Sequence, residues 1–254
     1  QIDNLKITQV PLGNLKLNAE ATSDENYNLD LSLKDAGIDF DLNGNYHTNN
    51  EESDVDFDLN LNKLNVKKIE DFAGDYIKDS DGNLYGNLKV KGNLSDLSYD
   101  GFLGFDQAQF NLKTLNTVFT FKDEKIDLTN NKMILNDFAI EDENGNMITA
   151  DGNATFEELT NPAFDLSFEA KNFQLLNSTA EDNDLYYGKL AFDATAKLKG
   201  DLDLPKLNLD LTIKDKSDLT YLVPTSQASI EERDGIVVFV NKEDPDNIMT
   251  QQAD

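Results

Sequence analysis

Few residues of this chain have the types and spacing that catalysis requires. It contains no cysteine and a single histidine, His47, which follows the turn-forming run Asn43-Gly44-Asn45. A lone histidine beside a turn is usually a solvated side chain, and no serine-hydrolase elbow, phosphate-binding loop or zinc-protease helix motif occurs. Among the 49 acidic residues, no pair stands out by its spacing as a general acid and base. The sequence therefore predicts no enzymatic activity and no cofactor.

The acidic run at residues 79–83 resembles part of a calcium-binding loop. In an EF-hand loop, glycine takes the sixth position and the first ligand lies five residues before it. With Gly82 in that position the first ligand would be Ile77, and with Gly145 it would be Ile140, and neither side chain carries an oxygen. Hairpin turns explain these runs better, although calcium bound loosely at acidic turns is an alternative. No metal site is predicted.

Most of the chain alternates apolar and polar residues with a period of two. Successive side chains of a strand point to opposite faces, so each such run places its apolar residues on one face. The runs with this pattern lie at residues 29–42, 55–61, 84–90, 103–105, 119–121, 126–128, 164–170, 190–198 and 207–213. Runs rich in Asn, Asp and Gly separate them, and these residues form tight hairpin turns. The pattern predicts an all-β, antiparallel sheet of roughly fifteen strands.

One segment departs from this alternation. Val66, Ile69, Phe72, Tyr76 and Ile77 recur at intervals of three and four, which predicts a short amphipathic helix near residues 66–78. Its apolar stripe should cover one end of the apolar face of the sheet. A second helical or irregular segment is expected at residues 172–184.

Two parts of the chain are also similar to each other in sequence. Tyr85-Gly86-Asn87-Leu88 leads to Lys-Gly-Asn-Leu, and about a hundred residues later a Tyr-Gly-Lys-Leu run leads to Lys-Gly-Asp-Leu. Repetition of a strand pair favours growth by stacking of hairpins. We therefore expect residues 1–254 to form a single elongated β segment of a larger protein, with quasi-repeat hairpins near 84–105 and 187–213.

Charge and composition narrow the classes of partner. The formal net charge is −27 and the isoelectric point is near 4.1, so the chain repels phosphate backbones and no nucleic-acid partner is expected. No apolar run is long enough for a membrane-spanning helix. The chain begins at Gln1, and we expect the anchor and targeting segments to lie in other parts of the protein.

An apolar sheet face must be covered, because full burial of a Leu or Phe side chain is worth about 1.5–3 kcal/mol. A second sheet, closure into a barrel, or an apolar guest would each cover it. Periodicity alone leaves these alternatives open.

The order and spacing of many short segments resemble the TamB family, whose members are also called AsmA-like. The segments that carry this resemblance are residues 84–92, 100–105, 115–117, 119–121, 126–128, 138–142, 145–146, 151–152, 161–166, 170–179, 184–188 and 219–224. They span roughly residues 84–240 and are most similar to the form found in Bacteroidota. The chain resembles a fragment from the internal to C-terminal region of this translocation and assembly module subunit.

The resemblance implies a β-taco, which is a long curled sheet, or half-pipe groove, with an apolar interior. It implies a periplasmic protein that is tethered to the inner membrane by a segment not present here. Such a protein guides phospholipid between the inner and outer membranes and supports outer-membrane protein assembly. Phospholipid acyl chains and an Omp85-family outer-membrane barrel are the implied partners, the barrel through parts outside this fragment.

The candidates for lining the groove are apolar residues of the alternating runs. They are Phe40, Phe57, Leu88, Phe105, Phe119, Phe121, Phe168, Phe192, Leu209 and Leu211. Each of them is equally compatible with an ordinary core position. Two rival functions fit the same pattern: an extracellular or surface β-sandwich module for adhesion or binding, and a passive structural spacer.

Overall fold

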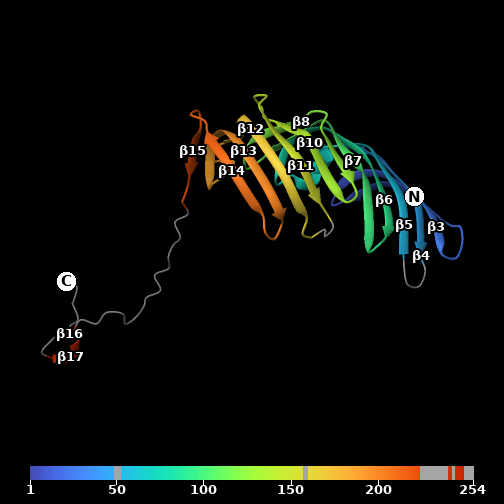
Figure 1. Ribbon diagram of the computed structural model, residues 1–254, viewed down its shortest axis with the longest axis horizontal. Helices are drawn as coiled ribbons and strands as arrows, with labels where there is room; N and C mark the ends of the chain where they lie inside the picture. The colour runs from blue at the N-terminus through green and yellow to red at the C-terminus, as the bar shows by residue number, and fades with distance from the viewer. Residues whose placement is uncertain (49–52, 157–159, 224–239, 242–243, 249–254) are drawn as a thin grey trace. The chain divides into compact units, whose positions relative to one another are not determined.

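The computed structural model describes residues 1–48, 53–156, 160–223, 240–241 and 244–248. The chain divides into two compact units, Gln1–Leu222 and Val223–Asp254. In the second unit, the short strands β16 (Val240–Asn241) and β17 (Asp244–Ile248) pair antiparallel. The remaining strands and the single described helix belong to the first unit (Figure 1).

The first unit is one 15-stranded sheet in which every pairing is antiparallel. Its strands are β1 (Ile2–Ile7), β2 (Val10–Ala21), β3 (Asn26–Asp35), β4 (Ile38–Thr48), β5 (Ser53–Asn65), β6 (Ile77–Asn93), β7 (Asp96–Leu112), β8 (Thr117–Phe121), β9 (Lys125–Thr129), β10 (Lys132–Glu141), β11 (Met147–Thr155), β12 (Ala163–Ser178), β13 (Tyr186–Asp201), β14 (Lys206–Ile213) and β15 (Asp218–Tyr221). Neighbours in the sheet are almost always neighbours in the chain. This is the predicted meander, but two runs predicted as hairpin turns lie inside strands. Residues 43–45 pair regularly within β4, and residues 79–83 form an irregular, bulged stretch of β6.

At two places in this meander, two short strands together occupy the position of one strand. β8 and β9 lie between β7 and β10, and each pairs with a different stretch of both. Similarly, β14 and β15 pair with successive stretches of β13. Between them, Ser217 Oγ accepts a hydrogen bond from the Ala191 amide and donates one to its carbonyl, both over 3.0 Å. The Ala191 carbonyl also accepts from the Lys214 amide over 2.9 Å, so the serine side chain replaces a backbone partner only for the Ala191 amide.

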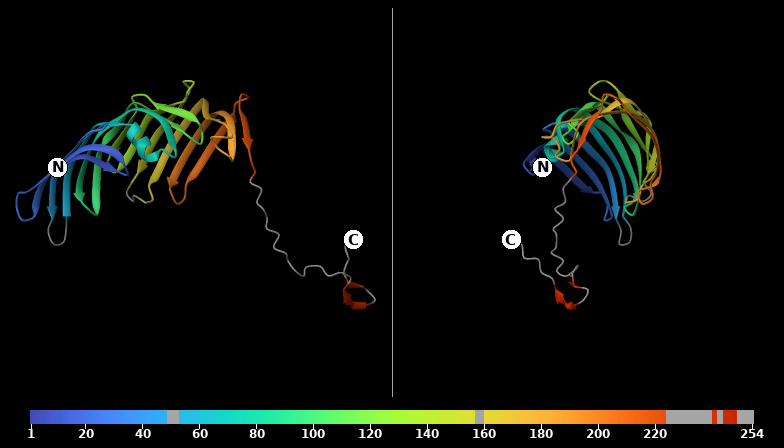
Figure 2. Two further views of the ribbon diagram at one scale, coloured as in Figure 1. Left: turned by 180° about the vertical axis from the view of Figure 1, so that it is seen from behind. Right: turned by 90° about the vertical axis from the view of Figure 1, so that its left-hand side faces the viewer.

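The sheet of the first unit curls strongly about its long direction (Figure 2). The predicted fold class, an all-β curled antiparallel sheet with one short helix, is confirmed. The alternative of two packed sheets does not apply to this unit, since all of its described strands belong to one sheet.

The helix α1 (Lys67–Ala73) connects β5 to β6 and is shorter than predicted. Its start is held by Asn65 Oδ1, which accepts a hydrogen bond from the Lys67 amide over 2.9 Å. It ends early because Ile77 is already the first residue of β6. Val66 and Ile77 are buried at its two ends, but Phe72 between them is 53% exposed. Of the apolar stripe, only the residues at the two ends of the helix are therefore buried.

Two further sequence expectations can be placed. Residues 172–178, expected to be helical or irregular, are the last part of strand β12. Strands β6 and β7 cover the first quasi-repeat hairpin, and β13 and β14 cover the second. The single elongated segment over residues 1–254 stays a prediction.

Candidate functional site

The registers of neighbouring strands align their apolar residues into rows that cross the sheet. Cross-strand partners lie on the same face of an antiparallel sheet. One such row, called here the long row, passes from β2 to β13 without a polar side chain. Its members, in order of pairing, are Leu17, Leu31, Leu42, Leu59, Leu88, Gly101, Leu128, Met133, Ala154, Phe164 and Gly200. The alternation in single strands thus becomes one continuous apolar face, called here the inner face.

Other rows run beside the long row on the same face. Leu15, Leu33, Phe40, Leu61, Gly86, Leu103 and Ile126 form one of them. On the C-terminal strands, Phe138, Ala150, Phe168, Ala196 and Leu209 form another. Because these rows run perpendicular to the strands, they follow the length of the curled sheet.

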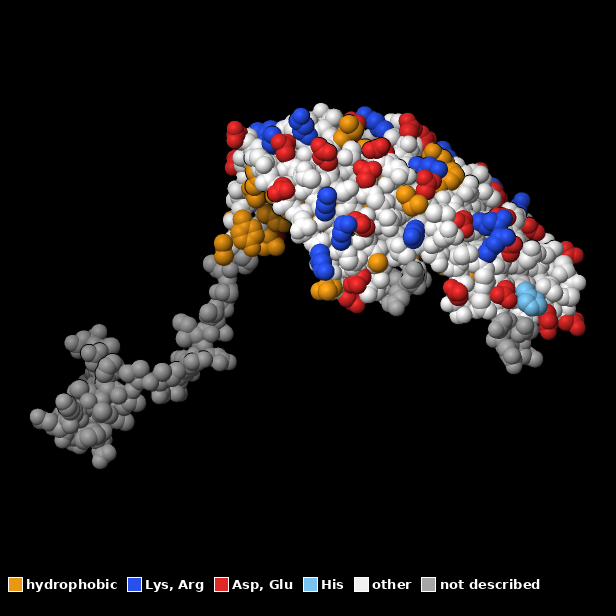
Figure 3. Space-filling model, viewed as in Figure 1, with side chains coloured by type: hydrophobic (Ala, Val, Ile, Leu, Met, Phe, Trp, Pro, Cys, Tyr) orange, Lys and Arg blue, Asp and Glu red, His pale blue; other side chains and the backbone are white. Residues whose placement is uncertain are grey.

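The opposite face, called here the outer face, is charged (Figure 3). Lys91 Nζ pairs with Asp56 over 2.8 Å, and Lys34 bridges Asp39 and Asp41. The hydrogen bond from Lys34 holds the pKa of Asp39 below its ordinary value, and the same contact raises the pKa of Lys34. Exposed pairs of this kind contribute little stability, but they keep the outer face hydrated and unsuited to an apolar guest.

A cluster of aromatic rings fills the curl near its middle. This central cluster contains Phe105, Phe110, Phe119, Phe121, Phe138, Phe168, Phe173 and Phe192, packed with smaller apolar residues. The rings of Phe105 and Phe121 stack with centroids 5.1 Å apart, and those of Phe119 and Phe173 with centroids 5.9 Å apart. The middle of the inner face is thus a packed core.

Strands β8 and β12 approach each other beside this cluster, although β10 and β11 separate them in the sheet order. The Asn177 amide donates to the Leu115 carbonyl over 2.9 Å, and Asn116 Nδ2 donates to the Asn177 carbonyl over 3.1 Å. Thr117, at the start of β8, is fully buried. These contacts close the curl locally at this end of the strands, whereas the long row passes nearer the other end.

The predicted groove residues fall into three groups. Phe40, Phe57 and Leu88 are half-buried and lie on β4, β5 and β6. Leu209 and Leu211 are each 51% exposed on β14, which has a partner on one side only. The other five, Phe105, Phe119, Phe121, Phe168 and Phe192, come together in the central cluster. Whether any of them contacts lipid stays a prediction.

Three rings of the cluster were not predicted: Phe110, Phe138 and Phe173. Phe138 and Phe173 each follow a β-bulge, where the register shifts. The bulge residues Asp137 and Asn172 have positive φ angles of 48° and 54°. The extra residue reverses the alternation, so a strict period of two assigns the ring to the wrong face. An Asn or Asp precedes both rings, but it also precedes Tyr46 and Phe57, which pair without a register shift, so no local signal in the sequence marks these bulges.

A small apolar pocket lies along the long row. It has a volume of about 260 Å³ and is lined by Leu88, Tyr99, Leu128, Asn131, Lys132 and Phe156. The Asn131 amide group bonds to the backbone, accepting from Tyr99 N and donating to the Leu97 carbonyl, each over 3.0 Å. The polar atoms of Asn131 are therefore occupied, and the pocket can take an apolar group.

The single histidine and the buried Asp142 each contact a neighbouring polar group of the protein. His47 Nδ1 lies 3.0 Å from Asn26 Oδ1 on the neighbouring strand. The buried Asp142 carboxylate accepts bonds from the amides of Asn144, Asn146 and Gln174, so it organises a turn. No group of three potential metal-ligating side chains occurs within the described ranges.

Comparison with known families supplies the identity of the C-terminal part. Residues 136–254 match the family model described as the TamB C-terminal domain. Over these residues the chain is similar to the TamB family. No curated protein and no solved structure matched. The narrower resemblance to the form found in Bacteroidota stays a prediction.

The TamB match begins inside β10 and covers the C-terminal strands of the sheet, including the rings of Phe138, Phe168, Phe173 and Phe192. It points to a role in the translocation and assembly module, whose TamB component is structural or transporting and not a known enzyme. Within the described residues, no helix has the length and apolarity needed to cross a membrane.

Proposed function

We propose that this TamB-family segment guides phospholipid between the inner and outer membranes, with the acyl chains resting on the inner face of the curled sheet. In this proposal it acts in the periplasm as part of a bridge-like protein and supports outer-membrane protein assembly. Parts of the protein outside this chain supply the inner-membrane tether and the contact with an Omp85-family barrel.

The long row is the observation that carries the proposal. It offers an apolar surface without a polar interruption from β2 to β13, and it passes beside the central cluster instead of through it. Each methylene removed from water is worth about 0.8 kcal/mol. A continuous apolar row therefore lowers the free-energy cost of moving an acyl chain out of a bilayer at every step.

The apolar pocket gives a starting position for a lipid on this row. Leu88 and Leu128 belong to both the pocket and the long row. The pocket surface is formed by apolar atoms alone, which suits an acyl chain.

The proposal is tested by purifying the protein without detergent and measuring the phospholipid that it carries, by mass spectrometry of the extracted lipids. Leu88→Asp places a carboxylate on the inner face, and we expect it to reduce bound phospholipid at least about tenfold, since a buried unpaired charge is strongly disfavoured. Asn87→Asp adds the same charge to the adjacent, exposed position and should leave lipid binding unchanged. Circular dichroism of both variants checks that the sheet is retained.

The packed central cluster favours one second candidate, a structural spacer that sets the distance between two membranes. A filled interior stiffens a curled sheet and needs no guest. If the wild-type chain and both variants carry no phospholipid, the spacer is supported and the conduit is rejected.

A further inference from the structure

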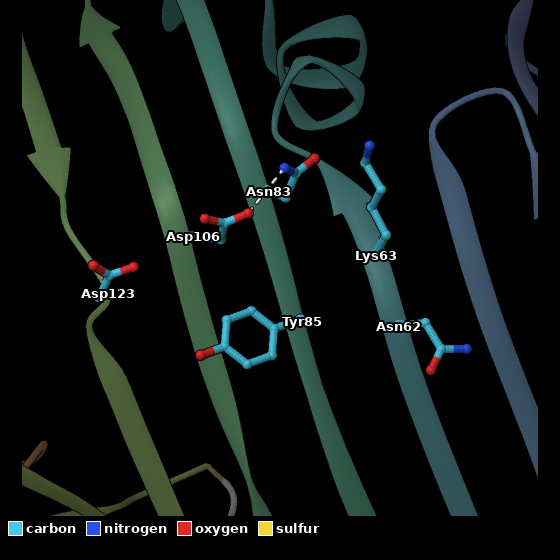
Figure 4. Close-up of a pocket in the computed structure, with 6 residues that line it drawn as sticks. All are labelled: Asn62, Lys63, Asn83, Tyr85, Asp106 and Asp123. Carbon is cyan, nitrogen blue, oxygen red and sulfur yellow. Dashed lines mark hydrogen bonds between the residues drawn. The ribbon is translucent and has the colours of Figure 1, made fainter.

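A shallow depression on the outer face is independent of the proposed lipid path. It has a volume of about 380 Å³ and its lining comes from β5, β6, β7 and the segment after β8 (Figure 4). The lining residues are Asn62, Lys63, Asn83, Tyr85, Asp106 and Asp123.

The floor of the depression is the ring of Tyr85, which lies flat on the sheet. Tyr85 pairs with Gly104 on β7, and a side chain at Gly104 would collide with the ring, so only glycine lets it lie there. The Phe102 ring meets it edge-on with centroids 5.9 Å apart. Tyr85 is 38% exposed, and Figure 4 shows the ring face-on. One ring face covers the backbone, and the other is presented to solvent.

A β-bulge brings additional polar side chains to this ring. On β5, Leu61 pairs with Gly86 and Leu64 with Leu84, so Asn62 and Lys63 together lie opposite Tyr85. The alternation therefore breaks at this point, and two consecutive polar residues line the depression beside the ring. Bulges of this kind commonly redirect side chains at functional sites.

The polar groups around the ring have unused hydrogen-bonding capacity. Asn62 uses its Nδ2 group for Asp39 and Asp41, each over 3.0 Å, which leaves its Oδ1 atom available. Asp106 accepts one long bond of 3.3 Å from Asn83. Lys63 and Asp123 make no ion pair with another described residue. Acceptors and one cationic donor thus surround an exposed aromatic face.

We propose that this depression binds a pyranose ring of a neutral glycan, with the sugar stacked on Tyr85. The C–H face of a pyranose packs on an aromatic ring, while carboxylates and amides bond to the hydroxyl groups at its rim. An apolar ligand would leave these polar groups unpaired. An anionic ligand would be repelled by the carboxylates of Asp106 and Asp123 in the lining.

Calorimetric titration of the whole chain with cellotetraose, maltotetraose and N-acetylchitotetraose tests the proposal. At least one of these sugars should bind with Kd below about 10 mM. Tyr85→Ala should weaken that sugar at least about fivefold, whereas Tyr85→Phe, which retains the ring, should bind nearly normally. Tyr76→Ala removes an exposed tyrosine elsewhere and should have no effect.

Tyr85→Ala uncovers Gly104 and could fail to fold for that reason. In that event Asp106→Asn and Asp123→Asn test the proposal. These variants leave the ring in place, and at least one should weaken the sugar measurably. Absence of binding to all the sugars, or equal binding by the wild type and every depression variant that remains folded, would overturn the proposal. Phospholipid carried by Tyr85→Phe should be unchanged, so this outcome is separate from the test of the lipid path.

Discussion

At the scale of single residues, the rings of the central cluster are the side chains whose loss should affect stability most. Phe138 is 7% exposed, and its ring centroid lies 5.6 Å from that of Phe105 and 6.0 Å from that of Phe121. Phe138→Ala should lower the free energy of unfolding by about 3–5 kcal/mol, because a cavity remains in a packed core. Urea denaturation followed by circular dichroism measures this.

Leu209→Ala is the matched control for that substitution. Leu209 belongs to the same row but is 51% exposed, so its truncation should cost less than about 1 kcal/mol. Equal losses for the two variants would mean that the central cluster is not a core.

Asp193 should make stability depend on pH. Its carboxylate accepts from Lys214 Nζ over 2.7 Å and from the Asn172 amide over 2.6 Å, and these bonds hold its pKa below the ordinary value of 3.8. A carboxyl group with a lowered pKa in the folded state stabilises the fold above its unfolded pKa. That stabilisation is lost as the pH falls through the lower, folded pKa.

Asp193→Asn removes this titration. Thermal unfolding between about pH 5 and pH 2 should show a smaller fall in Tm for the variant than for the wild type. A variant that loses Tm with the same slope would show that the Lys214 and Asn172 contacts do not carry the effect.

At the scale of strands, the bulge in β12 joins two stretches of opposite alternation. Asn172 has φ = 54°, a conformation that asparagine and glycine tolerate and β-branched residues do not. Asn172→Val should lower the free energy of unfolding by about 1–3 kcal/mol, while Asn172→Gly should be tolerated. Asn208→Val, at an exposed position of β14, should be nearly neutral, and an equal loss there would argue against backbone strain. Chemical denaturation of the three variants provides the comparison.

The edge strand β14 should promote association between copies of the chain. It pairs with β13 on one side only, and Leu207, Leu209, Leu211 and Ile213 are more than half exposed on it. An exposed apolar edge strand is a template for pairing with another chain. Light scattering during size-exclusion chromatography should show concentration-dependent assemblies that the double substitution Leu209→Lys and Leu211→Lys reduces. An unchanged size distribution would contradict this role of the edge.

The sequence predicts the fold correctly where the alternation of apolar and polar residues is uninterrupted. Leu29, Leu31 and Leu33 alternate strictly, so their strand and its apolar face were predictable. The helix was predicted too long because the periodicity from Val66 to Ile77 cannot show that Ile77 already pairs with Leu112. Phe138 and Phe173 were not predicted as members of the central cluster because each follows a bulge that reverses the alternation. The closure between Leu115 and Asn177 joins residues far apart in the chain, and alternation carries no information about such contacts.

At the scale of the whole sheet, the apolar rows arise from the pairing of strands and are not a property of any single strand. Each strand that the long row crosses supplies one member, and the pairing registers alone place these members side by side. The alternation predicted an apolar face for each strand, whereas the shared face depends on every register being correct. A slip of one residue in one pair would turn the following strands over, and the path for an acyl chain would end there.

The most direct measurement of the central claim is lipid capture by photo-crosslinkers at neighbouring positions of one strand. Leu42 lies in the long row, and Asn43 is the next residue of β4 and is exposed. With the photo-reactive amino acid at Leu42, cells should yield phospholipid adducts several-fold above those at Asn43, because only the inner face contacts acyl chains. Equal adduct yields at the two positions, or none at Leu42, would contradict the account.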